Sequence, residues 1–158
     1  MELRRKLLLN SCTFVAKITA DYGEELYNFQ MQCSSDTTGT MTFTVTSPDS
    51  VSGISGQISS DSAKLTFDGT VLTFPPLAGG KVVPVTAPWI FIHTLRSGFL
   101  SACGSDGDNR LILADDSYEE NALHLEILTD ATMKPLQAEI FWNQQLILSI
   151  EISDFVLQ

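Results

Sequence analysis

The sequence predicts a mainly β (α+β) fold: a strongly curved antiparallel sheet, or half-open β-barrel meander, with an apolar helix in its concave face and a short N-terminal helix. Three observations predict it. From residue 12 onward the chain is rich in Thr, Ser, Val, Ile and Phe and has few runs of helix formers. Apolar and polar residues alternate along successive segments that turn residues separate. One segment, 86–103, has apolar residues at helical spacing instead.

Length, charge and hydropathy limit the possible functions. The 158 residues, 44% of them apolar, suffice for one domain spanning residues 1–158. The formal charge of -10 would repel phosphate backbones and anionic headgroups, so we expect neither a nucleic-acid partner nor electrostatic membrane docking. No stretch approaches the roughly 20 apolar residues that span a bilayer.

Residues 1–10 predict a short amphipathic helix with Leu3, Leu7 and Leu8 on one face. The basic residues and leucines before Cys12 imitate a lipoprotein signal, but the apolar run is shorter than the roughly 7 to 15 residues of a signal peptide core. We therefore expect a missing export signal or lipid anchor to precede this helix.

Two strand-like segments on either side of Tyr22-Gly23 predict the first hairpin. A two-residue loop there places Phe14 opposite Met31 and makes one face of both strands apolar. It also places Cys12 opposite Cys33, at a separation that a disulfide accepts. The pair is either a disulfide that closes the hairpin or two small buried apolar residues.

Later segments repeat this pattern. One predicted pairing places Phe43 opposite Ile54, and another, around Asp68-Gly69, places Leu65 opposite Leu72. With the remaining segments, the chain predicts a meander of about eight to ten strands, each with one apolar face.

The last two predicted strands share a numbering rule. Even-numbered apolar residues point inward both in 136–142 and in 146–152, so paired positions must sum to an even number. The connecting loop must then hold an odd number of residues, and 143–145 is the expected loop. The segments 110–114 and 122–129 supply two more strands.

The segment 86–103 predicts a helix that Thr86 caps, with Pro88 in its first turn and Gly104 as its stop. It is apolar nearly all round, so it must be covered on most sides. The inner face of the sheet is the large apolar surface available to cover it.

No motif indicates catalysis, a metal or a cofactor. His93 and His124 lack neighbours at metal-ligand spacing. The serines do not form a nucleophile elbow, and 106–109 departs from the calcium-loop pattern. The acidic pairs 115–116 and 119–120 could act as general acid and base, but they are typical of a solvated loop. We expect a protein that is not an enzyme.

Five motifs of the chain belong together: the N-terminal helix, the hairpin at Ala20-Asp-Tyr-Gly, Ser47-Pro48 after a strand, Leu72-Thr-Phe-Pro75 before a helix, and the closing Ala138-Glu-Ile-Phe-Trp-Asn-Gln-Gln-Leu-Ile-Leu. Together they resemble the bacterial lipoprotein-carrier superfamily of the LolA and LolB kind, and a surface lipoprotein relative of those carriers fits as well. The resemblance implies an unclosed barrel in the cell envelope, with helices in its concave face and a cavity for acyl chains. It also makes Arg96 the counterpart of an Arg that the carriers place near the cavity.

These patterns lead to two hypotheses. In the first, the chain is an extracytoplasmic protein of the cell envelope without enzymatic activity, and we expect it to be a monomer. It binds a hydrophobic ligand, lipid or lipoprotein acyl chain between the sheet and the helix. It contacts the membrane only through an N-terminal anchor. In the second, the core is solid and the domain serves interaction or sensing in the envelope. The residues expected to line the cavity are Phe14, Phe29, Phe43, Trp89, Ile92, Arg96, Phe99 and Ile140.

Overall fold

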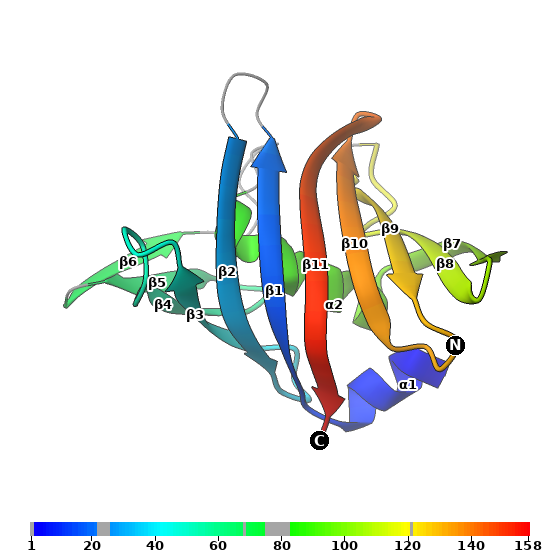
Figure 1. The fold of residues 1–158 in the computed structure, drawn as a ribbon, viewed down its shortest axis with the longest axis horizontal. Coiled ribbons are helices and arrows are strands. Elements are labelled where there is room, and N and C mark those ends of the chain that lie inside the picture. Colours follow the sequence, from blue (N-terminus) through cyan, green and yellow to red (C-terminus); the bar gives the residue numbers. More distant parts are fainter. Residues whose placement is uncertain (1, 22–25, 68, 75–82, 121) are drawn as a thin grey trace.

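A computed structural model describes residues 2–21, 26–67, 69–74, 83–120 and 122–158 (Figure 1). The elements, in chain order, are α1 (Glu2–Leu9), β1 (Cys12–Asp21), β2 (Leu26–Ser35), β3 (Met41–Ser47), β4 (Ser55–Ile58), β5 (Ala63–Phe67), β6 (Thr70–Phe74), the short 3-10 helix η1 (Pro84–Thr86), α2 (Ala87–Ser97), β7 (Phe99–Asp106), β8 (Asn109–Asp115), β9 (His124–Thr129), β10 (Pro135–Trp142) and β11 (Gln145–Leu157).

The strands form one antiparallel sheet in the order β6-β5-β4-β3-β2-β1-β11-β10-β9-β8-β7. The first and last strands therefore pair in the middle of the sheet, while β6 and β7, consecutive along the chain, lie at opposite edges (Figure 1). Because of this order, the chain must cross the whole sheet between β6 and β7, and α2 lies on that crossing.

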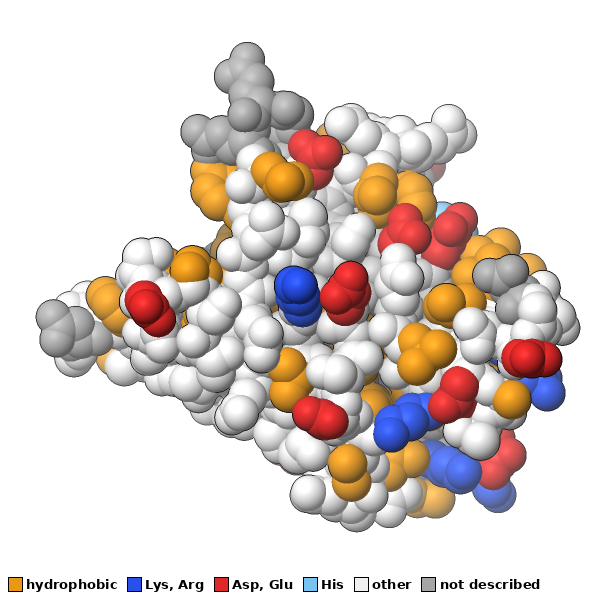
Figure 2. Space-filling model, in the orientation of Figure 1, with side chains coloured by type: hydrophobic (Ala, Val, Ile, Leu, Met, Phe, Trp, Pro, Cys, Tyr) orange, Lys and Arg blue, Asp and Glu red, His pale blue; other side chains and the backbone are white. Residues whose placement is uncertain are grey.

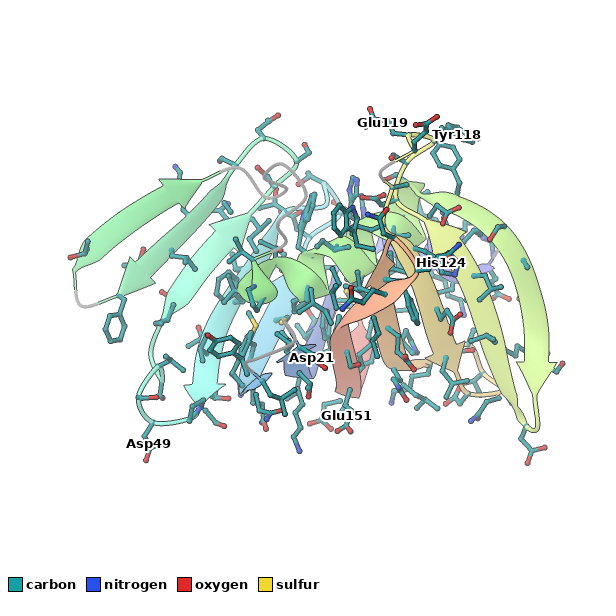
Figure 3. The ribbon with its side chains drawn as sticks, turned by 90° about the horizontal axis from the view of Figure 1, so that it is seen from above. Asp21, Asp49, Tyr118, Glu119, His124 and Glu151 are labelled. Carbon is teal, nitrogen blue, oxygen red and sulfur yellow. The ribbon has the colours of Figure 1, made fainter. Side chains whose placement is uncertain are left out.

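The sheet curves around α2, which lies in its concave face (Figure 3). Burial alternates along β1, where every second residue from Cys12 to Ala20 is buried. These inner residues and most of α2 belong to one apolar core. The predicted mainly β fold, with an apolar helix in the hollow of a curved sheet, is confirmed. Neither described helix is long and apolar enough to cross a membrane.

The register of the first hairpin differs from the prediction by two residues. Phe14 pairs with Cys33 rather than Met31, and Cys12 pairs with Ser35. The expected turn at Tyr22-Gly23 lies outside the described residues. A shift of two preserves the inner and outer faces, because side chains alternate with a period of two. The faces were therefore predicted correctly, and the direct pairing of the two cysteines was wrong.

The second hairpin is offset in the same way. Phe43 pairs with Gly56, not with Ile54. A Cβ on Gly56 would lie 2.6 Å from the Phe43 ring and 2.4 Å from the Lys64 carbonyl oxygen, so the ring needs a glycine opposite it. The predicted pairing of Leu65 with Leu72 is confirmed.

In the body of the C-terminal hairpin, paired residue numbers sum to an even number as predicted, but not because the loop is odd in length. Ala138 pairs with Ile150 as expected, but the loop consists of two residues, Asn143 and Gln144, with φ of 49° and 64°. Positive φ at both positions is typical of the two-residue turn that best suits a hairpin. A bulge on β11 opposite Ile140 and Phe141, where Ile147 is the extra residue, accounts for the odd number. It also turns Leu146 outward, where 38% of its surface is exposed.

Helix α2 is shorter than the predicted 86–103. It ends at Ser97, and the chain continues directly into β7, so the predicted stop at Gly104 is wrong and lies within a strand. Gly98 is the actual end. A Cβ there would lie 2.7 Å from the carbonyl oxygens of both Thr94 and Asp115, so a side chain would not fit where helix, turn and neighbouring strand meet. In α1, Leu3 and Leu7 are buried as predicted, but Leu8 is exposed.

Candidate functional site

The apolar trough is the concave inner face of the sheet, in which α2 lies. Five of the eight expected lining residues lie there and are almost fully buried: Phe14, Phe43, Trp89, Ile92 and Ile140. Phe29 is half-buried against the same core. The structure therefore brings together residues from β1, β2, β3, α2 and β10, which are far apart in the sequence.

Helix α2 fills the trough rather than leaving it open. The Phe91 ring packs edge-on against Phe14, with ring centroids 6.0 Å apart, and Phe155 packs on Phe14 at 5.9 Å. Neither Phe91 nor Phe155 was among the expected lining residues. Asp154 has a positive φ of 52° and lies next to a break in the β1–β11 register. Before this break the even-numbered residues of β11 point inward, and after it the odd-numbered Phe155 does.

Phe99 does not line the trough, contrary to the prediction. It begins β7 rather than continuing α2, and its neighbour Leu100 packs on the core instead. The Phe99 ring contacts Tyr118, at the rim of a hollow of about 580 Å³ that the acidic loop after β8 also lines. The helical spacing that included Phe99 was therefore misleading.

The C-terminal end of α2 is held by an arginine from the other helix. Arg4 on α1 donates from Nε to the Leu95 carbonyl at 2.6 Å, and from Nη2 to the carbonyls of Thr94 at 3.1 Å and Gly98 at 2.6 Å. The last carbonyls of a helix lack partners within it and carry partial negative charge. The guanidinium therefore satisfies both the hydrogen-bond demand and the dipole of α2.

Arg96 makes the reciprocal contact. It extends from α2 and donates from Nη1 to the carbonyl of Leu7, in the last turn of α1, and from Nη2 to the carbonyl of Thr37, both at 2.5 Å. We call the two arginines, Arg4 and Arg96, the arginine clamp. The role of Arg96 at a ligand cavity stays a prediction, and in this structure its guanidinium binds two backbone carbonyls.

Polar groups also lie along α2 on the N-terminal side of the arginine clamp. Trp89 is buried, and its indole N–H finds no hydrogen-bond partner in the described part of the chain. Its ring stacks on His93 with centroids 4.6 Å apart. Burial lowers the pKa of His93, while the nearby Asp116 carboxylate opposes that shift. Burial also raises the pKa of Asp116, although its carboxylate accepts the Leu123 N–H at 2.7 Å. Both groups are thus biased toward their neutral forms.

Cys12 and Cys33 are free thiols on neighbouring strands, diagonal to each other. Burial raises the pKa of Cys12 to about 11, and burial with the neighbouring Cys12 raises the pKa of Cys33 further. Both behave as buried apolar residues, which was the second of the two interpretations. Cys103 lies exposed on the edge strand β7.

The outer face of the sheet carries polar groups, among them His124. His124 points outward, as its strand phase predicted, and its Nδ1 lies 2.9 Å from Asp115. No group of three acidic, Cys or His residues in the described ranges is arranged to hold a metal ion.

A hollow of about 890 Å³ lies on the outer face of β1 to β6. Its lining crosses the strands in register through Val15, Gln32, Thr44, Ser55 and Thr66. Uncharged polar side chains dominate the lining, and this wing of the molecule is correspondingly pale in Figure 2. This groove is on the opposite face from the apolar cavity that the sequence predicted.

Comparison with known proteins gives structural but not sequence relatives. No family model matches the chain, and no curated protein matches its sequence. The solved structures that are similar over 99% of this chain include three with TM-scores above 0.5. An uncharacterized conserved protein from Thermus thermophilus is 10% identical, with a TM-score of 0.54 over 85% of that chain.

The other two structures bear on the resemblance seen in the sequence. A LolA superfamily protein from Nitrosomonas europaea is 11% identical, with a TM-score of 0.52 over 92% of its length. A protein domain from Vibrio parahaemolyticus named for outer membrane lipoprotein sorting is 11% identical, with a TM-score of 0.53 over 90% of its length. At these identities the similarity concerns the fold, and the chain has the LolA-like fold.

Proposed function

We propose that this protein is a monomeric, non-enzymatic binding protein of the cell envelope that takes an acyl chain of a lipid or lipoprotein into its apolar trough when α2 moves aside. The observation that carries the proposal is the trough itself, whose wall is apolar from β1 to β10 and which a single helix fills. The LolA-like fold supports the ligand class and an extracytoplasmic location, since one solved structure with this fold is named for lipoprotein sorting.

The contacts of α2 support a pivoting motion. Within the described residues, the side-chain hydrogen bonds between α2 and other elements are those of the arginine clamp, at its C-terminal end. Toward its N-terminal end, the Thr86 hydroxyl donates within the same segment, to the Val83 carbonyl. Apolar contacts, which are not directional, hold the rest of α2. An acyl chain could replace them with contacts of the same kind, while the clamp keeps α2 attached.

Fluorescence of Trp89 tests this proposal. The chain has two tryptophans, and the second, Trp142, lies on β10, so Trp142→Phe leaves Trp89 as the sole reporter. We expect saturable uptake of a long-chain fatty acid to change the Trp89 emission, because its indole leaves a dry environment. Uptake with unchanged Trp89 emission, or no uptake at all, would overturn the proposal. Native mass spectrometry of protein purified from cells provides a second readout, since bound lipid should be retained.

The alternative function is an interaction or sensor domain with a permanently filled core. The tight packing of Phe14, Phe91 and Phe155 favours it. This alternative predicts that fatty acid neither binds nor alters the Trp89 emission, so the same experiment separates the two functions.

A further inference from the structure

The end of the molecule formed by α1, the β9–β10 loop and the C-terminal end of β11 combines exposed apolar and basic side chains. We define the α1 surface as Arg5, Lys6, Leu8, Leu9, Lys134 and Val156, all of which are exposed. Figure 2 shows basic and hydrophobic side chains gathered over α1 along the lower edge. We propose that the α1 surface docks on an anionic lipid membrane.

The apolar part of this surface lies outside the hydrophobic core. Leu3 and Leu7 already provide the buried side of α1. Leu8 and Leu9 point elsewhere and are 48% and 72% exposed, and Val156 on β11 is 49% exposed. A short helix with a second, solvent-facing apolar side beside basic residues is the pattern of helices that lie in the membrane interface.

The charge distribution favours this end over the rest of the molecule. Three of the nine Lys and Arg residues lie on the α1 surface, although the chain as a whole carries -10. Two nearby carboxylates count against these cations: Glu2 lies 3.2 Å from the Lys6 ammonium, and Asp130 accepts the N–H groups of its own loop. Three cations and two carboxylates still leave these groups with a net formal charge of about +1, against -10 for the chain. The net charge alone predicted repulsion from anionic headgroups. Its uneven distribution instead lets an anionic membrane attract this end and repel the remainder, which fixes the orientation of docking.

A small pocket adjoins the surface and can receive part of a lipid. It measures about 220 Å³, and its apolar lining consists of Leu3, Met133, Phe155 and Leu157. The polar residues beside them are Lys6, Lys134, Thr132 and Glu2, the ion-pair partner of Lys6. This volume is several times the roughly 30 Å³ share of one water molecule. Ammonium groups beside an apolar hollow suit a lipid that has an anionic headgroup and an aliphatic tail.

Met133 gives independent support for this pocket. The loops 36–40 and 130–134 have the same hydrogen bonds, in which an aspartate accepts from a threonine two positions on and from the N–H four positions on. Loop 36–40 has Gly39 at the left-handed position, with φ of 90°, whereas the second loop has Met133 there, with φ of 68°. A side chain is unfavourable in this conformation. The loop nevertheless keeps a flexible apolar side chain at the point where it lines the pocket.

Vesicle sedimentation tests the docking. We expect the protein to bind phosphatidylcholine vesicles that contain phosphatidylglycerol, to bind pure phosphatidylcholine far less, and to lose binding as salt screens the charges. The double variant Arg5→Gln/Lys134→Gln should bind anionic vesicles about 30-fold more weakly, because each basic residue near such a surface contributes substantially to binding. Leu8→Ser/Leu9→Ser should weaken binding by about tenfold or more, because insertion of both side chains is lost.

Matched variants elsewhere on the molecule control for general effects. Lys17→Gln/Lys64→Gln removes two exposed cations from the sheet, and Phe67→Ser/Val71→Ser removes two exposed apolar side chains from the β5–β6 hairpin. Both should bind as the wild type does. Equal losses in test and control variants, equal binding to neutral vesicles, or no binding at low salt would each overturn the proposal. Fatty-acid uptake in solution should be unchanged in the α1-surface variants, so this proposal and the proposed function fail separately.

Discussion

Removing Arg4 should destabilise the protein far more than removing its neighbour on the same helix. The Arg4 guanidinium donates three hydrogen bonds to carbonyls at the end of α2. A hydrogen bond from a charged group contributes roughly 1.5 to 3 kcal/mol when it is buried. Arg4 is half-buried, and water can partly replace it, so we discount each bond to about 1 kcal/mol. We expect Arg4→Met to lower the free energy of unfolding by about 2 to 3 kcal/mol.

Urea unfolding followed by circular dichroism measures this loss, and a melting temperature lowered by about 5 to 10 °C should accompany it. Arg5→Met is the matched control, because Arg5 is exposed and forms no hydrogen bond or ion pair within the described part of the chain. It should change the free energy of unfolding by less than about 0.5 kcal/mol. If both variants unfold alike, the arginine clamp does not stabilise the packing of the two helices, and the pivot inferred for α2 is wrong.

Three further predictions concern the packing, the thiols and the acid stability. Gly56→Ala should cost about 1 to 3 kcal/mol in urea unfolding because its Cβ would overlap backbone and ring atoms, whereas Gly104→Ala, with no neighbour within 4 Å, should leave stability nearly unchanged. Cys103 is exposed and should be alkylated rapidly in native protein. Cys12 should react slowly, because its pKa is raised from 9.0 to about 11, which lowers its thiolate population about 100-fold. A disulfide would instead leave fewer than three titratable thiols after denaturation without reductant. Hydrogen bonds from its own turn hold the pKa of Asp36 below its usual value of 3.8. The ionised carboxylate therefore stabilises the fold fully above pH 3.8, and this stabilisation is lost as the pH falls through the lower pKa of the folded state. Asp36→Asn should flatten the decline of the unfolding free energy below about pH 4, and an unchanged decline would contradict this.

The faces of the strands could be predicted from the sequence, but the lengths of their loops could not. Alternation fixes which residues point inward, and it is unaffected by a shift of two positions. This is why β1 has the predicted inner face although Phe14 pairs with Cys33 instead of Met31. The disulfide hypothesis depended on the absolute register, so it failed where the apolar face succeeded.

Bulges were a second limit on prediction. The even-sum rule for the last hairpin holds for Ala138 and Ile150, but a bulge rather than a longer loop satisfies it. The positive φ of Asp154 similarly brings Phe155 into the trough. Neither position has a glycine, and although Asp adopts positive φ more readily than most residues, it is common in ordinary backbone too. Alternation alone therefore predicts the wrong phase beyond each position.

The candidate site was predicted in composition more than in shape. The spacing of Trp89 and Ile92 correctly indicated a helix buried by the sheet, but Phe99 extended that spacing by coincidence past the true end at Gly98. The basic end of the molecule could not be predicted from the net charge. It depends on the folded positions of Arg5 and Lys134, which lie 129 residues apart in the sequence. In the structure Arg5 is on α1, and Lys134 lies beside that helix.

The filled trough follows from the topology. Since β1 and β11 pair in the middle, the chain must pass from one edge of the sheet to the other, and α2 on the concave side is part of that passage. A ligand for the trough therefore competes with a helix that is covalently held beside its own binding site. The apparent association constant of the ligand is the intrinsic constant multiplied by the fraction of molecules in which α2 is displaced. A variant that weakens the arginine clamp, such as Arg4→Met, should raise that fraction, so it should bind fatty acid more tightly than the wild type while being less stable. Lower stability without tighter binding would mean that the helix is a fixed part of the core, as the interaction-domain alternative requires.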